Sequence, residues 1–382
     1  MYNQDGDVMI TKIERLDHQG RGIAKINDKI TFIPKCLPGE VVDVSITLDK
    51  KKYMEARLNK VIEKSPSRID VDCPYFELCG GCQLRHMSYE DELKYKENKV
   101  KDIFKKYATF DTKINEVVGT NIDRYRNKIV FQVDKKIGFF EEKTNKLIPI
   151  EKCLLISDEM NEVLKDISID NINQITIREG NELMVFDNYY NKLLDTNDSI
   201  ISNIGDVKYK VSQKSFFQIN KNQTVNLYNK VLEYASLKGS ENVLDLYCGI
   251  GSIGLFLANK AKHVLGVEIN SSSIEDANYN AKLNNITNTE FILGDTKKVL
   301  SDNSFKADVV VVDPPRSGLD KEVVNDLLKI NPDKIVYVSC DPITLVRDLN
   351  LLNVNYNIKE VSLFDMFPRT YHIESVVLLE RK

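Results

Sequence analysis

Residues 243–251, Val-Leu-Asp-Leu-Tyr-Cys-Gly-Ile-Gly, decide the fold class of this 382-residue chain. The apolar run predicts a buried strand, and Gly249 and Gly251 predict a tight turn into a helix over 251–258. Further strands are expected at 264–267, 291–293, 309–312, 334–338 and 375–379, with helices at 273–283, 322–330 and 343–352. This alternation is typical of a mostly parallel, doubly wound α/β sheet with right-handed crossovers.

Three domains are expected along the chain. Residues 1–66 contain short alternating apolar runs separated by turn residues, which predicts a five-stranded β-barrel of the OB type. Residues 67–204 combine a cysteine-rich segment, a lysine-rich helix near 89–107 and mixed β-structure, and are expected to form a small α+β domain. Residues 205–382 contain the doubly wound sheet.

The composition is that of a globular protein, with 42% hydrophobic and 29% charged residues. No apolar run approaches the ~18 residues that a membrane span needs. The first ten residues lack the basic-then-apolar pattern of a secretory signal. We therefore expect a cytoplasmic protein without a membrane partner, and a monomer.

The net charge of −4 argues against binding of a polyanion through bulk charge. The charge is uneven, however. Residues 1–153 carry 29 Lys and Arg against 25 Asp and Glu, whereas residues 154–382 carry 24 against 32. Any nucleic-acid recognition should therefore depend on local basic patches, stacking and base insertion, with a shallower salt dependence than that of a strongly basic binder.

The carboxyl ends of the predicted strands carry a candidate nucleotide site. The glycines after the first strand let a ligand approach the backbone N–H groups of a helix N-terminus. Glu268 follows 17 residues after Gly251, where a carboxylate can accept both ribose hydroxyls, and Asp295 ends the third strand where adenine is expected. A turn that serves packing alone and a dinucleotide site are alternatives, although the full G-x-G-x-x-G pattern is absent. With Asp313-Pro-Pro-Arg316 after the fourth strand, the set is similar to the S-adenosylmethionine-dependent methyltransferase fold.

A cysteine and a carboxylate suggest the reaction. Cys340 stands in Ser-Cys-Asp-Pro after the fifth strand, and Glu374 stands in His-Ile-Glu-Ser before the last one. C5 of uracil is too weak a nucleophile to attack a sulfonium methyl unless a thiolate first adds to C6, and a base must then remove the C5 proton. A buried small hydrophobe and an ordinary strand-edge carboxylate are the alternatives. His372, two residues from Glu374, is an alternative base.

These motifs together resemble the RNA uracil-C5 methyltransferase family over nearly the whole chain. Ser215-Phe-Phe-Gln-Ile-Asn220 matches a further segment of that family. The resemblance implies that Cys340 is the nucleophile and Glu374 the general base, and that Gln218 and Asp313 orient the uracil, with help from Arg316. Ser252 stands where some members have Asn. The implied cofactor-binding residues are Gln218, Tyr247, Gly249, Gly251, Ser252, Glu268, Asp295 and Asp313.

Four further cysteines, Cys73, Cys79, Cys82 and Cys153, suggest a metal site. Three clustered thiols and one 71 residues beyond favour iron–sulfur ligation over the two close pairs typical of structural zinc, and unmetallated thiols are the third possibility. The resemblance adds that larger family members carry a [4Fe-4S] cluster at these positions. Cys36 and Cys248 are expected to be packing residues.

The N-terminal region resembles the TRAM domain, an RNA-binding module of the OB type, on Asp17-His-Gln-Gly-Arg-Gly22 and Phe32-Ile-Pro-Lys-Cys-Leu-Pro-Gly39. Such modules hold single-stranded RNA with basic and stacking residues. Arg21, Lys35 and Lys50-Lys-Lys-Tyr53 are candidates for this contact, and solvated surface loops are the alternative for the lysines.

We therefore predict an enzyme that makes 5-methyluridine in RNA, with the uridine flipped out to reach Cys340. A 23S ribosomal RNA target is favoured because many bacterial tRNA members of the family lack both the barrel and the cluster. The T-loop uridine of tRNA is the alternative target. A methyltransferase acting on an exocyclic amine and a non-catalytic RNA-binding iron–sulfur protein are the alternative classes.

Overall fold

The computed structural model describes residues 8–302 and 305–382. The chain divides into two compact units. Unit 1 consists of Met1–Lys99, Phe139–Ile150 and Phe367–Tyr371. Unit 2 consists of Val100–Gly138, Glu151–Met366 and His372–Lys382.

Unit 1 begins with a six-stranded sheet of order β1-β5-β6-β4-β3-β2. The strands are β1 (Val8–Lys12), β2 (Arg15–Leu16), β3 (Gly22–Ile26), β4 (Lys29–Ile33), β5 (Val41–Asp49) and β6 (Tyr53–Glu63). Alternate residues such as Val42 and Val44 are fully buried, as a sheet with one face on a core requires. The expected closed five-stranded barrel is not confirmed: in the described part of the chain β1 and β2 are outer strands that do not pair with each other. β2, with two residues, offers little edge for such a closure.

A buried ion network fixes the loop Phe367–Tyr371 within unit 1. The loop packs on the first part of α1 (Tyr89–Tyr107), where the Lys96 ammonium donates to Glu92 Oε1 at 2.7 Å and the Arg369 backbone N–H donates to the same oxygen at 2.7 Å. The Arg369 guanidinium donates to the Glu92 carboxylate and to the Met87 carbonyl. This loop ends three residues before Glu374. Strand β10 (Leu147–Pro149) also belongs to unit 1.

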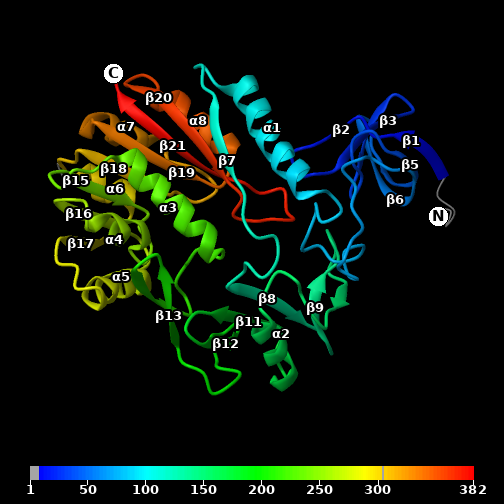
Figure 1. Cartoon of the computed structure of the whole chain (residues 1–382), viewed down its shortest axis with the longest axis horizontal. Coiled ribbons are helices and arrows are strands. Elements are labelled where there is room, and N and C mark those ends of the chain that lie inside the picture. Colours follow the sequence, from blue (N-terminus) through cyan, green and yellow to red (C-terminus); the bar gives the residue numbers. More distant parts are fainter. Residues whose placement is uncertain (1–7, 303–304) are drawn as a thin grey trace. The chain divides into compact units, whose positions relative to one another are not determined.

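Unit 2 contains the predicted doubly wound sheet, with eight strands in the order β17-β16-β15-β18-β19-β21-β20-β7 (Figure 1). The neighbours from β17 to β19 are parallel, and β21 is antiparallel to both β19 and β20. The strands are β7 (Ile114–Val118), β15 (Asn242–Leu246), β16 (His263–Glu268), β17 (Thr289–Leu293), β18 (Val309–Val312), β19 (Lys334–Ser339), β20 (Tyr356–Phe364) and β21 (Glu374–Arg381). β7 pairs with β20 in parallel, so a strand from the expected central region extends this sheet.

The helices between these strands include α3 (Lys221–Ala235), α4 (Ser252–Ala258), α5 (Ser271–Leu283), α6 (Thr296–Asp302), α7 (Lys321–Ile330) and α8 (Pro342–Leu352). Four of them, α4, α5, α7 and α8, are the predicted ones, and α3 and α6 are two further ones. All four residues of β18 are buried because helices cover the sheet, as parallel strands require. Among the described residues, no helix has the length and apolarity needed to cross a membrane.

The remaining elements of unit 2 are strands, which form smaller sheets, and two short helices. These elements are β8 (Lys128–Val133), β9 (Ile137–Phe140, which runs into unit 1), α2 (Asp158–Glu162), a 3₁₀ helix (Val163–Asp166), β11 (Gln174–Glu179), β12 (Leu183–Asp187), β13 (Ser199–Ile204) and β14 (Val207–Ser212). The antiparallel sheet contains β8, β11 and β12, and β13 pairs with β14. The edge of β14 is bound by helix α5: Asn284 and Asn280 accept hydrogen bonds from the Lys208 and Lys210 backbones at 2.8 and 2.6 Å. Asn280 and Asn284 are four residues apart along the chain, and Lys208 and Lys210 are two residues apart on the strand. The two spacings cover nearly the same distance, so the same kind of hydrogen bond forms twice.

Candidate active site

The carboxyl ends of the parallel strands in unit 2 bring most of the predicted residues to one edge of the sheet. Leu246, the last residue of β15, pairs with Val267 of β16 and with Val312 of β18. The residues that follow these three positions are Tyr247, Glu268 and Asp313. They lie on neighbouring strands because parallel strands end on the same side. The edge is therefore the candidate site.

The loop after β15 has a backbone that favours glycine. Tyr247, Gly249 and Gly251 have φ values of +63°, +55° and +75°, in the left-handed region. A Cβ at Gly251 would meet the ring of Phe291 at 2.8 Å, so a larger residue does not fit there. Within this loop the Cys248 N–H donates to the Val267 carbonyl at 3.1 Å, and the Gly251 N–H donates to the Cys248 carbonyl at 2.9 Å.

Glu268 is oriented by two backbone N–H groups. The Gly249 N–H donates to Glu268 Oε2 at 3.1 Å and the Asn270 N–H donates to Oε1 at 2.8 Å. Each carboxylate oxygen keeps a further acceptor site, which matches a pair of adjacent ribose hydroxyls. This arrangement fits the nucleoside part of S-adenosylmethionine.

The other predicted cofactor contacts differ in their surroundings. Ser252 Oγ accepts a hydrogen bond from the Tyr228 hydroxyl at 2.8 Å, and its own proton remains available for a ligand. Asp295 is exposed and accepts from the Lys298 backbone N–H at 3.3 Å, at the start of α6. Gln218 is buried, and its backbone carbonyl accepts from Asn127 Nδ2 at 2.9 Å, so its position is fixed by the segment before β8.

Asp245 is a site residue to which the sequence analysis assigned no role. Its Oδ2 accepts from the Gly254 N–H at 2.8 Å, and its Oδ1 is buried without a hydrogen-bond partner among the described residues. Burial raises the pKa of Asp245 to about 8, and the nearby Asp313 and Glu268 add to the rise. A buried acceptor without a partner is costly, so Oδ1 is suited to a donor from a ligand. The available signal was an acidic residue in an otherwise apolar strand before a glycine-rich turn.

Cys340 and Glu374 face one another across the end of a strand pair. In the antiparallel pair of β19 and β21 the last matched residues are Ser339 and Ser375. Beyond this pair the next residue is Cys340 on the side of β19 and Glu374 on the side of β21. Burial raises the pKa of the Cys340 thiol to about 12; Glu374 and Asp313 add to the rise and Arg316 opposes it. The two predicted catalytic groups are therefore close enough to influence each other's charge.

The charge on Glu374 is also disfavoured. Its side chain is buried, which raises its pKa to about 8, with Asp313 adding to the rise and Arg316 opposing it. Burial likewise raises the pKa of Asp313 to about 7. Acids with strongly perturbed pKa values in one place are typical of active sites. His372 lies before the first residue of β21, so the strand alternation expected to align it with Glu374 does not extend to it.

The predicted cluster ligands are four cysteines, Cys73, Cys79, Cys82 and Cys153. Cys73, Cys79 and Cys82 belong to unit 1 and Cys153 to unit 2. All four are free, and within the described residues no group of three or more His, Cys, Asp or Glu could hold a metal ion. Burial raises the pKa of Cys79, and the nearby Cys73 adds to the rise. The predicted [4Fe-4S] cluster therefore lacks support from the structure. Cys36 and Cys248 are buried, as expected of packing residues.

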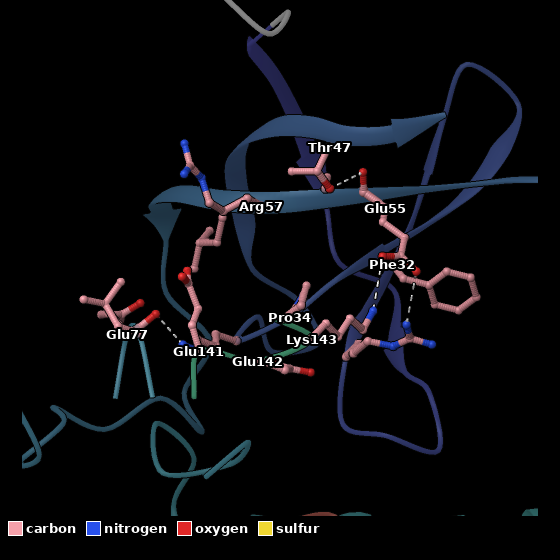
Figure 2. Close-up of a pocket in the computed structure, with 14 residues that line it drawn as sticks. Phe32, Pro34, Thr47, Glu55, Arg57, Glu77, Glu141, Glu142 and Lys143 are labelled. Carbon is pink, nitrogen blue, oxygen red and sulfur yellow. Dashed lines mark hydrogen bonds and ion pairs between the residues drawn. The ribbon is translucent and has the colours of Figure 1, made fainter. Parts of the chain in front are cut away.

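Unit 1 contains a cavity of about 370 Å³ beside β4, β5 and β6 (Figure 2). Two of the predicted RNA contacts, Arg21 and Lys35, line it. The Arg21 guanidinium lies 4.4 Å from the centre of the Phe32 ring, and the Lys35 ammonium donates to the Phe76 and Glu77 carbonyls at 2.6 Å. The lining has as many acidic as basic residues, so the cavity does not present a strong positive field. Its charged residues are Arg21, Lys35, Glu55, Arg57, Glu77, Glu141, Glu142 and Lys143.

Comparison with known proteins defines the class of this chain. The model of the tRNA (uracil-5-)-methyltransferase family matches residues 167–299 and 295–382, and the TRAM domain model matches residues 4–58. An uncharacterized RNA methyltransferase of Halalkalibacterium halodurans is 37% identical, with 98% of this chain and 97% of the relative covered. Another from Staphylococcus aureus strain N315 is also 37% identical, with 98% of each chain covered.

A solved structure resembles nearly the whole chain. It is the tRNA (uracil-54, C5)-methyltransferase of Pyrococcus abyssi in complex with S-adenosyl-L-homocysteine, with a TM-score of 0.80 and 29% identity. The likeness covers 97% of this chain and 99% of that one. The chain belongs to the tRNA (uracil-5-)-methyltransferase family. It is an RNA methyltransferase with an N-terminal TRAM domain, and S-adenosylmethionine is its methyl donor.

Proposed function

We propose that this enzyme converts a specific uridine of RNA into 5-methyluridine, with Cys340 as the nucleophile and Glu374 as the base. The observation that carries the proposal is the placement of these two residues directly beyond the last pair of β19 and β21. They stand at the same sheet edge as the glycine-rich loop and Glu268. A methyltransferase that acts on an exocyclic amine has no use for a thiol at this position.

The proposed reaction exchanges the C5 proton of uracil for a methyl group. The Cys340 thiolate attacks C6, and the C5–C6 π electrons move toward O4 to give an enolate. S-adenosylmethionine, when bound, would supply the methyl group to C5 and leave as S-adenosylhomocysteine, whose sulfur keeps the electron pair of the broken S–CH3 bond. Glu374 then removes the C5 proton, the C5–C6 double bond re-forms, and the Sγ–C6 bond breaks to regenerate the thiolate. Glu374 finally releases its proton to solvent.

The charges of the site determine when each residue can act. A charged Glu374 or Asp313 opposes ionisation of Cys340, and Arg316 supports it. Cys340 is therefore activated most easily while its neighbouring carboxyl groups are protonated, and a cationic methyl donor beside them would favour the thiolate further. Glu374, with a pKa near 8, accepts a proton more readily than an exposed glutamate does.

The binding groups for the donor are proposed to be those that the structure leaves available. The Glu268 oxygens would receive the ribose hydroxyls, and the glycine-rich loop would lie beside the methionine part. The unpartnered Oδ1 of Asp245 would accept a hydrogen bond from the donor's ammonium group. Gln218 and Asp313 would orient the uracil.

The experiment is covalent trapping on 5-fluorouridine RNA. Fluorine at C5 cannot leave as a cation, so the proposed intermediate should remain attached to Cys340 and migrate as a protein–RNA adduct under denaturing conditions. Cys340→Ala should give neither adduct nor methylated RNA, whereas Cys36→Ala, which removes another buried thiol, should retain both. The absence of an adduct with the wild type, or of tritium release from uridine labelled at C5, would contradict the mechanism.

For the target we propose a uridine of 23S ribosomal RNA. The TRAM domain at residues 4–58 supports this choice, because many bacterial tRNA members of the family lack such a module. The T-loop uridine of tRNA is the second candidate, favoured by the likeness to the Pyrococcus abyssi tRNA enzyme. Transcripts of both RNAs, incubated with tritiated donor and then mapped for 5-methyluridine, decide between them. A methylated tRNA with an unmodified 23S transcript would overturn the first choice.

A [4Fe-4S] cluster on Cys73, Cys79, Cys82 and Cys153 is a separate proposal. Its support is the sequence spacing and the thiolate chemistry of the four residues. Anaerobic purification followed by iron and sulfide analysis and Mössbauer spectroscopy tests it. About four irons and four sulfides per chain, lost in Cys82→Ser, are expected. Iron-free protein with unchanged folding would refute the proposal.

A further inference from the structure

Two cations of unit 2 occupy directly opposed positions of an antiparallel strand pair. Lys128 on β8 pairs with Arg178 on β11. Side chains alternate along a strand, so both lie on the face opposite the buried Ile129 and Ile177. Like charges in such a pair destabilise the sheet. A negatively charged group beside the two residues would offset this repulsion.

The nearby carboxylate of Asp276 does not supply this partner. It accepts from the Ser212 N–H at 3.0 Å, the Ser212 hydroxyl at 2.8 Å and the Ser215 hydroxyl at 2.7 Å, and it forms an ion pair with Lys210 at 3.3 Å. Asp276 raises the pKa of Arg178, but no ion pair within the described residues joins a carboxylate to Lys128 or Arg178. The local charge therefore remains positive.

Arg178 also has a donor that no group of the described residues accepts from. Its side chain is buried, with 4% of the residue exposed, and one guanidinium nitrogen donates to the Ser215 carbonyl at 2.5 Å. The Nε atom is buried without a partner in the described part of the chain. Burial lowers the pKa of Arg178 to about 10 and that of Lys128 to about 8, and the charge of Arg178 contributes to the latter. An anion beside the two residues would relieve both penalties.

The pair adjoins the segment that carries Gln218. Asn127, the neighbour of Lys128, donates from its backbone to the Ile219 carbonyl at 2.8 Å and from its side chain to the Gln218 carbonyl. Arg178 holds the Ser215 carbonyl three residues earlier. Arg178 and Asn127, the neighbour of Lys128, are thus bonded to the segment 215–219, which carries Gln218.

We propose that Lys128 and Arg178 form a binding site for one phosphate group of the substrate RNA, next to the target uridine. Lys128, which is half-buried, donates to a phosphate oxygen, and Arg178 behind it adds a second positive charge and fixes the Ser215 carbonyl. The inference rests on the proposed function, because the reaction places an RNA strand here. The carboxylate of the methyl donor is the other anion in the reaction, and the experiment separates the two.

The test measures RNA binding without turnover. Lys128→Gln, Lys128→Arg and Lys208→Gln are compared with the wild type for their Kd toward the 23S and tRNA transcripts over a series of salt concentrations. Lys208 is an exposed strand lysine of the same unit and serves as the matched control. Calorimetry gives the Kd for S-adenosylmethionine. Lys128→Gln should bind RNA about tenfold more weakly at low salt. The slope of the logarithm of its RNA affinity against the logarithm of the salt concentration should be smaller in magnitude by about 0.7 to 1.

The control variants sharpen the outcome. Lys128→Arg, which keeps the charge, should retain most of the affinity, and Lys208→Gln should leave the slope unchanged. Unchanged RNA affinity and slope in Lys128→Gln would overturn the inference. Weaker binding of S-adenosylmethionine with unchanged RNA binding would assign the pair to the donor's carboxylate and would also overturn it. Failure of the proposed function shows separately, as wild-type protein that binds RNA but forms no 5-methyluridine.

Discussion

Replacement of Glu374 by glutamine should stabilise the protein at alkaline pH while it stops turnover. Glu374 is 5% exposed, and burial and the neighbouring Asp313 raise its pKa from 4.5 to about 8. A carboxyl group with a raised pKa stabilises the fold when protonated. This contribution is complete below about pH 4.5, and it is lost as the pH rises through about 8. Glutamine has nearly the same shape and carries no charge, so it avoids the loss.

The size of the effect follows from the two pKa values. The difference between about 8 and the ordinary 4.5 corresponds to roughly 5 kcal/mol at 1.36 kcal/mol per pH unit. The amide must still find an acceptor in a buried site, which costs about 1–3 kcal/mol if none is found. We therefore expect Glu374→Gln to be on the order of 2–5 kcal/mol more stable than the wild type at about pH 9, and to lose this advantage as the pH falls toward 4.5.

Urea unfolding of both proteins at several pH values measures the gain, and methylation assays measure the loss. Wild-type turnover should rise with pH through about 8, because proton removal from C5 requires the carboxylate form of Glu374 and attack on C6 requires the thiolate form of Cys340. Glu374→Gln should accumulate the covalent methylated adduct on ordinary uridine RNA, since the thiolate cannot leave until the C5 proton does. A variant with the same pH dependence of stability as the wild type would refute the reasoning about burial. Normal turnover by the variant would refute the role of Glu374 as base.

Three other substitutions have definite expected outcomes. Cys340→Ser should lower methylation by at least about 10³-fold, because an alcohol ionises far less readily than a thiol, while calorimetry should show normal S-adenosylmethionine binding. Glu268→Ala should weaken S-adenosylmethionine binding about 100-fold, because two hydrogen bonds to a charged acceptor are lost, and RNA binding measured by filter retention should be unchanged. Lys96→Met should lower the free energy of unfolding by about 3 kcal/mol in urea titrations, since Glu92 then keeps a buried charge with fewer partners; an unchanged midpoint would contradict the importance of that network.

The doubly wound sheet could be predicted because its signals are local. Four consecutive valines predict a strand buried on both faces, and Val309–Val312 is such a strand. The glycines after β15 predict a turn with positive φ, and Gly249 and Gly251 adopt positive φ values. Side chains after parallel strands must share an edge, and the motif positions Tyr247, Glu268 and Asp313 therefore converge as expected.

Other features depended on residues that are distant in the sequence. The network of Lys96, Glu92 and Arg369 joins positions more than 270 residues apart, and no periodicity indicates such pairing. Lys128 and Arg178 are opposed only in the observed strand register. A shift of one strand by one residue would move its side chains to the other face of the sheet. The strand β7 joins the large sheet through a pairing with β20 that its own sequence does not specify.

The sequence by itself therefore determined the fold class, the family resemblance and the identity of the two proposed catalytic residues, because each is encoded in a short motif. Only the tertiary structure decided their charges and surroundings. Cys340 and Glu374 occupy opposed positions directly beyond the last pair of β19 and β21, and burial raises the pKa values of both. It also decided which donors remain without partners, as at Arg178. Burial and pairing are properties of the assembled chain, since they depend on atoms that residues from several elements place around a group.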